Sequence, residues 1–487
     1  MKKTIFLAAI LLSVLVTNFL AQETPPAPAA PKAVSVPAAQ EKKLANGLTV
    51  AVIEKRAVPL VTIQLLVKYG ASAEDANKAG LADITASMLT KGTTTRTATQ
   101  IAEAVEFLGG TISSGAGWNG SNVAITVTSD KVDQAMAILS DVILHPKFDQ
   151  KELDLLKTQS LDGLTYNLKQ PSALANYVAS KYSFGEHPAG GTPASIASIT
   201  KSDVESFYEN GFLADFSIII FTGEVTAAAA AATAEKYLGG MKKYVRTDAP
   251  STRAEPVGLP FISGDKPSFA QRLLVVDLPK SGQASVGYYK SNPGVGRKDE
   301  LFYPASVLNS VLGGGYSSRL NLEIRIKRGL SYGAGSSFAW RYNAMNFSTR
   351  AQTKNESAAQ VAELVLGELK KLADSTVAAD ELVPRKSVLT GNFGRNLETT
   401  AGLANALADL YTFSVPRTEL NSYVDNVNGV SDKQIKDFAS RAFFGGDIII
   451  VGDYSVFKDD LAKRFPNMKV DVIKAGELDL SNDNLRK

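Results

Sequence analysis

The sequence predicts an α+β protein of two homologous halves, each a mostly antiparallel sheet with helices packed on one face. First, apolar β-rich runs alternate with segments of helical periodicity from about Lys43 onward. Second, two series of residues echo each other, because Val204 and Ile435 are separated by 231 residues and Lys157 and Lys386 by 229. An ordered series at nearly one spacing indicates an internal duplication, and each half is long enough to hold a sheet with its helices.

The first half opens with apolar β-rich runs and continues with helical periodicity. Thr97 and Gln100 stand in front of an apolar helical pattern, which is the signature of a capping box, and Gly109 with Gly110 ends that helix. The elements expected here, in order, are strands over 48–53 and 61–67, helices over 80–89 and 97–108, a strand over 123–127 and a helix over 130–144.

The repeat links a helix to an apolar strand in both halves. Residues 199–224 and 430–453 share the order of a helix, an Ile-Ile-Ile strand and a glycine followed by an acidic residue. Between them, several prolines interrupt any periodic pattern over 242–266. The expected organisation is a signal peptide (1–21), a Pro/Ala-rich tether (22–42), an N-terminal domain (43–245), a linker (246–268) and a C-terminal domain (269–487).

The first residues have the pattern of a secretory signal. Lys2 and Lys3 precede an apolar run over 5–16, and cleavage is expected after Ala21. The apolar run is too short for a helix that spans a membrane, although an uncleaved anchor is the alternative. We therefore expect an exported protein, in a bacterial periplasm, with no membrane anchor after cleavage.

Composition excludes several classes of function. A formal net charge of +3 is too small to indicate binding to nucleic acid or to an anionic membrane. The absence of cysteine excludes disulfides, thiolate metal ligands, a thiol nucleophile and a lipid anchor on an N-terminal cysteine.

The helix predicted over 80–89 carries the most specific motif of the first half. The segment 80–93 resembles the signature helix of the pitrilysin-type (M16) metallopeptidases, which implies a pitrilysin/processing-peptidase-like form of the predicted fold. Active members carry the inverted motif His-x-x-Glu-His, in which two histidines bind zinc and the glutamate activates the metal-bound water. By this resemblance Asp83 and Ser87 occupy the histidine positions and Ala86 the glutamate position, so the zinc motif is degenerate.

No other residues supply the missing ligands. The chain has two histidines, His145 and His187, and their separation fits no zinc-ligand spacing, so an ordinary loop histidine is the preferred interpretation of each. Asp162 lies where the family has a further acidic ligand, but one carboxylate is an ordinary surface acid. A site of oxygen ligands built on Asp83 and Asp162 would need a third hard ligand and a placed base. We therefore predict no metal and no other cofactor in this chain.

The second half contains a glycine-rich loop. Gly313, Gly314 and Gly315 leave the backbone bare and flexible, and Ser317 or Ser318 is placed to cap a following helix. Phosphate binding is the alternative for such a loop, but no Gly-Lys-Ser/Thr follows it, which excludes a P-loop.

A helix is expected over 320–327, ended by Gly329, with a strand from Tyr332. This stretch resembles the Arg-x6-Tyr motif of the same family, with Arg325 and Tyr332 at its two positions. The resemblance implies that Tyr332 hydrogen-bonds the scissile carbonyl oxygen, that Arg325 holds the substrate backbone, and that the glycine-rich loop tethers substrate. The alternative is a solvated helix arginine and a half-buried strand tyrosine.

By this resemblance, the first half has lost the zinc motif and the second half has kept the substrate-binding Arg325 and Tyr332. The resemblance therefore implies that another subunit supplies the missing zinc site. We expect a zinc-less subunit that pairs with a homologue bearing His-x-x-Glu-His, the zinc being held by that partner and Arg325 and Tyr332 acting in trans on peptides in an enclosed chamber. The chain alone is then inactive. The rival is a non-enzymatic structural or peptide-binding protein of the same family.

Overall fold

The computed structural model describes residues 34–244, 269–482 and 484–487. The predicted signal peptide, the first part of the predicted tether and the predicted linker over 246–268 lie outside these residues. Within the described ranges, no helix has both the length and the apolar character that crossing a membrane requires.

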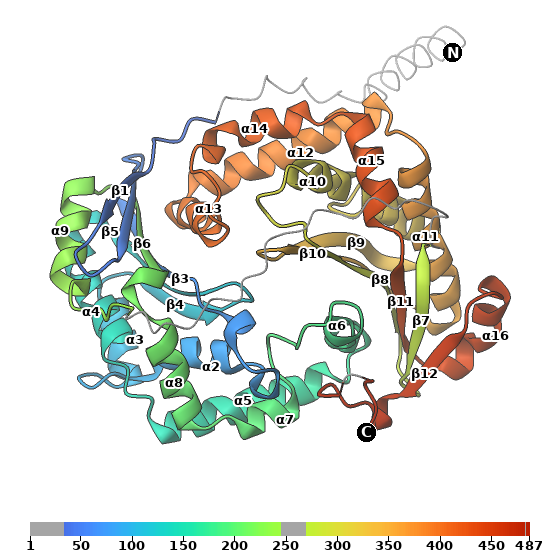
Figure 1. The fold of residues 1–487 in the computed structure, drawn as a ribbon, viewed down its shortest axis with the longest axis horizontal. Helices are drawn as coiled ribbons and strands as arrows, with labels where there is room; N and C mark the ends of the chain where they lie inside the picture. Colours follow the sequence, from blue (N-terminus) through green and yellow to red (C-terminus); the bar gives the residue numbers. More distant parts are fainter. Residues whose placement is uncertain (1–33, 245–268, 483) are drawn as a thin grey trace, which may run out of the picture. The chain divides into compact units, whose positions relative to one another are not determined.

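The first half contains one six-stranded sheet. Its strands are β1 (Gln40–Lys43), β2 (Thr49–Glu54), β3 (Leu60–Val67), β4 (Thr111–Ala116), β5 (Ser121–Thr128) and β6 (Ser217–Gly223). They are ordered β1-β2-β6-β3-β5-β4 (Figure 1), with β2 and β6 parallel and the other neighbours antiparallel. Along β5 buried and half-buried residues alternate, as in a strand with one face on the core.

Helices of the first half contribute buried residues to the core of this sheet, except the helix over Pro171–Tyr182, whose buried residues belong to another core. They are α2 (Leu81–Met88), α3 (Ala98–Phe107), α4 (Val132–Leu144), α5 (Gln150–Asn167), α6 (Pro171–Tyr182), α7 (Pro193–Ser198), α8 (Lys201–Gly211) and α9 (Ala227–Leu238). The predicted capping box of Thr97 and Gln100 is present at the start of α3, where each side chain accepts from the other residue's backbone N–H.

The second half repeats the architecture. Its strands are β7 (Ala270–Asp277), β8 (Ala284–Pro293), β9 (Ser331–Trp340), β10 (Ala344–Thr353), β11 (Gly446–Gly452) and β12 (Val470–Lys474). The order is β12-β7-β11-β8-β10-β9, with β7 parallel to β11 and β12 and the remaining neighbours antiparallel. The edge strand β9 therefore corresponds to the edge strand β4 of the first sheet.

The second half has its own helices and its own core. They are α10 (Phe302–Leu312), the π-helix η7 (Asn321–Ile326), α11 (Ala358–Asp374), α12 (Ala379–Glu398), α13 (Thr400–Thr412), α14 (Glu419–Gly429), α15 (Asp432–Ala442) and α16 (Tyr454–Arg464). In Figure 1, α11 and α16 lie along one side of the second sheet.

Each half also contributes one helix to the sheet of the other half. Leu174 and Val178 of α6 are buried against β7, β8 and β11. In return, α13 packs on β3 and β6, where the hydroxyls of Thr400 and Thr62 are 2.8 Å apart and the Thr222 hydroxyl donates to the Thr400 carbonyl at 2.8 Å. Because this exchange covers the second face of the sheet, every residue of β6 is buried.

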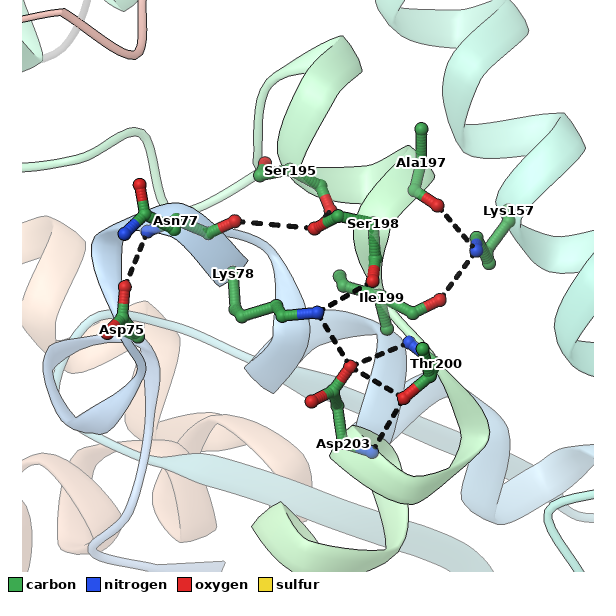
Figure 2. Close-up of polar contacts among 10 residues, drawn as sticks. All are labelled: Asp75, Asn77, Lys78, Lys157, Ser195, Ala197, Ser198, Ile199, Thr200 and Asp203. Atoms are coloured by element: carbon green, nitrogen blue, oxygen red, sulfur yellow. Dashed lines mark hydrogen bonds and ion pairs between the residues drawn. The ribbon is translucent and has the colours of Figure 1, made fainter.

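The lysine that marks the repeat in the sequence closes a helix end in the first half. Lys157 of α5 donates to the carbonyl oxygens of Ala197 at 3.0 Å and Ile199 at 2.5 Å, at the end of α7 (Figure 2). From the other side, Lys78 donates to the carbonyl oxygen of Ser198 at 2.6 Å. Such cations satisfy terminal carbonyls and compensate the negative end of the helix dipole.

Lys386 performs the same task in the second half. It lies on α12 and donates to the carbonyl oxygens of Asn428 at 2.8 Å and Val430 at 2.5 Å, at the end of α14. The next helix begins with a capping box in both halves, on Thr200 in α8 and on Ser431 in α15. Contacts of the same kind at matching places support the internal duplication that the sequence spacing predicts.

The predicted fold class, two homologous halves with mostly antiparallel sheets, is confirmed. Three details differ from the prediction. Ordered structure starts before Lys43, because β1 begins at Gln40 and the Val36 N–H donates to the side chain of Asn421. The helix expected over 320–327 is a π-helix, and neither serine caps it, since the Ser318 hydroxyl donates instead to the Gly315 carbonyl at 2.6 Å.

Candidate functional site

Helix α2 carries the degenerate zinc-motif positions. Ala86 is completely buried, Ser87 is half-buried and Asp83 is exposed. Ala86 has no group that accepts a proton, and a serine hydroxyl is a poor zinc ligand. By the resemblance to the M16 peptidases, Ala86 stands at the position of the water-activating glutamate, and its methyl group is packed in the protein interior.

The N-terminus of α2 is held by a buried carboxylate. Glu74 accepts hydrogen bonds from the backbone N–H groups of Gly80 at 2.8 Å and Ala82 at 2.7 Å, and His187 Nε2 lies 3.0 Å from the same carboxylate. The Glu74 side chain is fully buried. A buried carboxylate requires such donors, so His187 completes the cap of α2.

The surroundings of Asp83 do not form a metal site. Burial by the neighbouring protein raises the pKa of its carboxyl group, the Ala116 N–H at 3.5 Å opposes this increase, and the charge of Glu74 reinforces it. Because the side chain is exposed, solvent screens these effects. Asp162 is exposed on α5, and His145 lies 3.6 Å from Asp141. Among the described residues, no three His, Cys, Asp or Glu side chains are grouped to hold a metal ion, so the residues present do not fit zinc.

The glycine-rich loop of the second half packs directly on β9. The Ser336 N–H donates to the Gly313 carbonyl at 3.2 Å, and a Cβ on Gly313 would lie only 2.1 Å from the Ser336 nitrogen. Only glycine permits this approach of two backbones. Gly314 and Gly315 are exposed, and a Cβ on Gly315 would meet open space.

Side chains of α12 and η7 fix the rest of this loop. Arg385 of α12 is buried and donates to both the hydroxyl and the carbonyl oxygen of Ser317. Arg319 forms two hydrogen bonds to Glu381, at 2.8 and 2.7 Å. Asn321 of η7 donates to the Tyr316 carbonyl and accepts from the N–H of Ala334 in β9 at 3.3 Å. Charge-assisted and paired hydrogen bonds of this kind hold a loop in one geometry.

Arg325 and the glycine-rich loop line one cavity of about 710 Å³. The Arg325 guanidinium lies 5.0 Å from the centroid of the Tyr316 ring, and Arg350 of β10 lines the same cavity. Tyr332 is 88% exposed at the start of β9, next to Gly333, which lines the cavity. Arg325 is half-buried, and Tyr332 is more exposed than the half-buried strand tyrosine of the alternative interpretation.

One polar contact between the halves was not predicted. Arg341 at the end of β9 forms two hydrogen bonds to Glu186, at 2.8 and 2.7 Å, and its guanidinium lies 4.9 Å from the centroid of the Trp118 ring. The Asn346 amide also donates to Glu186, at 2.9 Å. These residues come from loops and strand ends far apart in the chain and belong to no local motif, so no sequence pattern identifies them.

The two halves have pitrilysin-type architecture, and the sequence contains no His-x-x-Glu-His motif. The profile described as "Insulinase (Peptidase family M16)" matches residues 49–181, and the profile described as "Peptidase M16 inactive domain" matches residues 198–388. The chain therefore belongs to peptidase family M16.

Curated relatives include proteins named as proteases and one named otherwise. An "Uncharacterized zinc protease" of Rickettsia felis is 25% identical over 392 residues, covering 79% of this chain and 91% of the relative. The "Uncharacterized zinc protease YmxG" of Bacillus subtilis is 22% identical over 403 residues, covering 82% and 94%. The "Non-peptidase homolog YmxG" of Helicobacter pylori is 24% identical over 396 residues, covering 79% and 87%.

Solved structures share the fold. A peptidase M16 inactive domain from Pseudomonas fluorescens matches with a TM-score of 0.75 and 24% identity, covering 85% of this chain and 98% of that one. A protease from Helicobacter pylori matches with a TM-score of 0.77 and 18% identity, covering 86% and 100%.

Proposed function

We propose that this chain is the zinc-less subunit of a heterodimeric M16 peptidase, exported to the periplasm, and that Arg325 and Tyr332 act in trans on peptides bound at a zinc site of a His-x-x-Glu-His partner. The observation that carries this proposal is the contrast between the two halves. Ala86 is buried where a proton acceptor is required, whereas Tyr332 is exposed beside a cavity that Arg325 lines.

The cavity has the chemistry of a site for peptide backbone. Arg325 and Arg350 supply permanent cationic donors, and the exposed backbone of Gly314 and Gly315 leaves room for an extended chain. β9 is the edge strand of its sheet, and the N–H groups of Ala334 and Ser336 on its outer edge already donate to Asn321 and Gly313, so the exposed glycine backbone beside this edge is what a peptide would meet. Tyr332 at the start of this strand is placed to donate a hydrogen bond to a carbonyl oxygen as charge develops there.

A partner is needed because the chemistry is incomplete in this chain. Among the described residues, no cluster of three or more ligands is arranged to bind zinc, and Ala86 offers no base. Charge stabilisation by Tyr332 alone accelerates no hydrolysis unless a nucleophilic water is activated nearby. A homologue with an intact motif supplies that part.

The second candidate is a non-enzymatic structural or peptide-binding subunit. The name of the Helicobacter pylori relative, "Non-peptidase homolog YmxG", favours it. The same cavity serves this function, since binding of a peptide requires no activated water.

A titration separates the two. A His-x-x-Glu-His homologue from the same source, at fixed concentration, is mixed with increasing amounts of this chain, and turnover of a quenched-fluorescent peptide is measured. We expect activity to rise and to saturate at one equivalent. Formation of a complex without any gain in turnover would favour the non-enzymatic candidate.

A further inference from the structure

A second cavity lies among the helices of the second half, at residues distinct from those that line the cavity of Arg325. It has a volume of about 310 Å³, is open to solvent, and is lined by α12, α13, α14, the start of α10 and the segment that precedes α10. Its size and its mixture of aromatic and charged side chains are those of a pocket for a small molecule.

The charged groups of this cavity carry one excess negative charge when ionised. Arg297 is 6% exposed, donates to the Glu419 carboxylate and lies 3.3 Å from the Asp409 carboxylate. Its guanidinium is also 3.4 Å from the centroid of the Phe302 ring. One arginine thus faces two carboxylates, and an anion entering the cavity would have to displace one of them from Arg297. A cation that enters the cavity would instead be attracted by the excess negative charge and could bind a carboxylate without displacing Arg297.

Asp409 is the carboxylate that a ligand reaches. Its side chain is 48% exposed, whereas that of Glu419 is 13% exposed. Burial by the surrounding helices raises the pKa of Asp409, Arg297 opposes this increase and Glu419 reinforces it. A bound cation beside Asp409 would favour the ionised carboxylate, so binding and ionisation stabilise each other.

Aromatic rings form the apolar part of the wall. Phe393 and Tyr423 are stacked, with centroids 4.1 Å apart and planes at 20°. Both of these rings line the cavity, together with Phe302. Aromatic faces attract ammonium and guanidinium groups.

We propose that this cavity binds a small organic cation, an ammonium or guanidinium group on a short carbon chain, with Asp409 as the accepting carboxylate and Phe393 and Tyr423 as the aromatic wall. The charge comes from a free amine or from the side chain of a basic residue in a peptide. The proposal is independent of the function of Arg325 and Tyr332. Because Asp409 lies on α13, which packs on the sheet of the first half, binding also stabilises the contact between the halves.

Calorimetric titration of the full chain with agmatine, which carries both cationic groups, tests this. We expect saturable binding, a melting temperature that rises with agmatine, and no binding of the neutral 1,4-butanediol or the anionic glutarate. Asp409→Asn should weaken the binding of agmatine roughly ten-fold or more, because it removes a charge-assisted hydrogen bond. Asp425→Asn, the same change at an exposed position of α14 outside the cavity, should leave binding unchanged.

Phe393→Leu gives a second variant whose effect does not depend on the ion cluster, and circular dichroism shows that each variant is folded. We expect Phe393→Leu to weaken the binding of agmatine several-fold. A parallel titration with an end-blocked Gly-Arg-Gly peptide identifies the source, since tighter binding of the peptide assigns the cavity to a basic side chain and tighter binding of agmatine to a free amine. The proposal is overturned if neither cation binds, if butanediol or glutarate binds equally well, or if Asp409→Asn and Asp425→Asn behave alike.

Discussion

Each half has a six-stranded sheet with the same strand order apart from the edge strands β1 and β12, and each has a lysine clamp, in which Lys157 or Lys386 binds the carbonyl oxygens at a helix end. The halves differ in one loop, which follows α2 in the first half and α10 in the second. In the first half, Thr93, Thr95 and Arg96 all donate to Asp141, at 2.7, 2.8 and 2.6 Å. The matching loop of the second half contains Gly313, Gly314 and Gly315, is held by Arg385 of α12 through Ser317, and lines a cavity.

Both loops line a cavity, so the difference lies in how each loop is held and in what it exposes. The first loop is tied to Asp141 of α4 by its own side chains and lines a cavity of about 480 Å³. The second loop leaves the backbone of Gly314 and Gly315 exposed and lines the same cavity as Arg325, which fits the proposed binding of a peptide. Four sets of substitutions test this comparison, beginning with the largest expected effect.

The first substitution removes the hydroxyl group of Tyr332 in the second half. In a complex with a His-x-x-Glu-His homologue, Tyr332→Phe should lower kcat about 10²–10³-fold, because it removes a donor to the developing charge. Peptide turnover at saturating substrate measures this, and gel filtration should show an unchanged complex. Tyr166→Phe, at another exposed tyrosine, is the control. Equal turnover of both variants would remove Tyr332 from the mechanism.

The second substitution tests the close approach of the glycine-rich loop to β9. Gly313→Ala should lower the free energy of unfolding by about 1–3 kcal/mol and displace the loop, because the new Cβ would lie 2.1 Å from the Ser336 nitrogen. Gly315→Ala is the matched control, since its Cβ meets open space. Denaturant unfolding compares the two, and similar losses would mean that the loop does not depend on this contact.

The third substitution loosens the first-half loop. Asp141→Asn should cost about 1–3 kcal/mol of stability, because three donors lose a charged acceptor. Burial opposes ionisation of Asp141, but the hydrogen bonds from Thr93, Thr95 and Arg96 outweigh it and lower its pKa.

The pH dependence of the same pair follows from that lowered pKa. The stabilisation by Asp141 is complete above its unfolded pKa of about 3.9 and is lost as the pH falls through the lower, folded value. The difference in unfolding free energy between wild type and Asp141→Asn should therefore shrink below about pH 4. A difference that stays constant with pH would contradict the assigned hydrogen bonds.

The fourth set consists of two substitutions with the smallest expected effect. It tests whether the lysine clamp is equally important in the two halves. Lys157→Met and Lys386→Met each remove a cation from two helix-terminal carbonyls and should each cost about 1 kcal/mol. Thermal unfolding of both variants provides the comparison. A large loss for one and none for the other would show that the clamp has kept its importance in only one half.

Features carried by local patterns were predictable from the sequence. The capping box at Thr97 and the strands near 48–53, 61–67, 123–127, 218–220 and 448–450 follow from short-range patterns, and the repeat of Lys157 and Lys386 follows from a constant spacing of the two series. The degenerate zinc-motif positions and the Arg325–Tyr332 pair come from a family resemblance of short segments, which lie on α2 and on η7 with β9, and their roles stay predictions.

Features that depend on distant residues were not predictable. Arg385 holds a loop 68 residues earlier in the chain, and Glu74 meets His187 across 113 residues. A π-helix uses the same residue types as an α-helix, so periodicity over 320–327 does not separate them. The exchange of α6 and α13 also leaves no local signal, since an apolar helix face looks the same whichever sheet it covers.

The most direct test of the division between the halves is the zinc content and peptidase activity of this chain alone, of its His-x-x-Glu-His homologue alone, and of their complex. The account predicts no zinc and no turnover for this chain alone, and zinc held by the homologue with full turnover only in the complex. Stoichiometric zinc together with peptide turnover in this chain alone would contradict it.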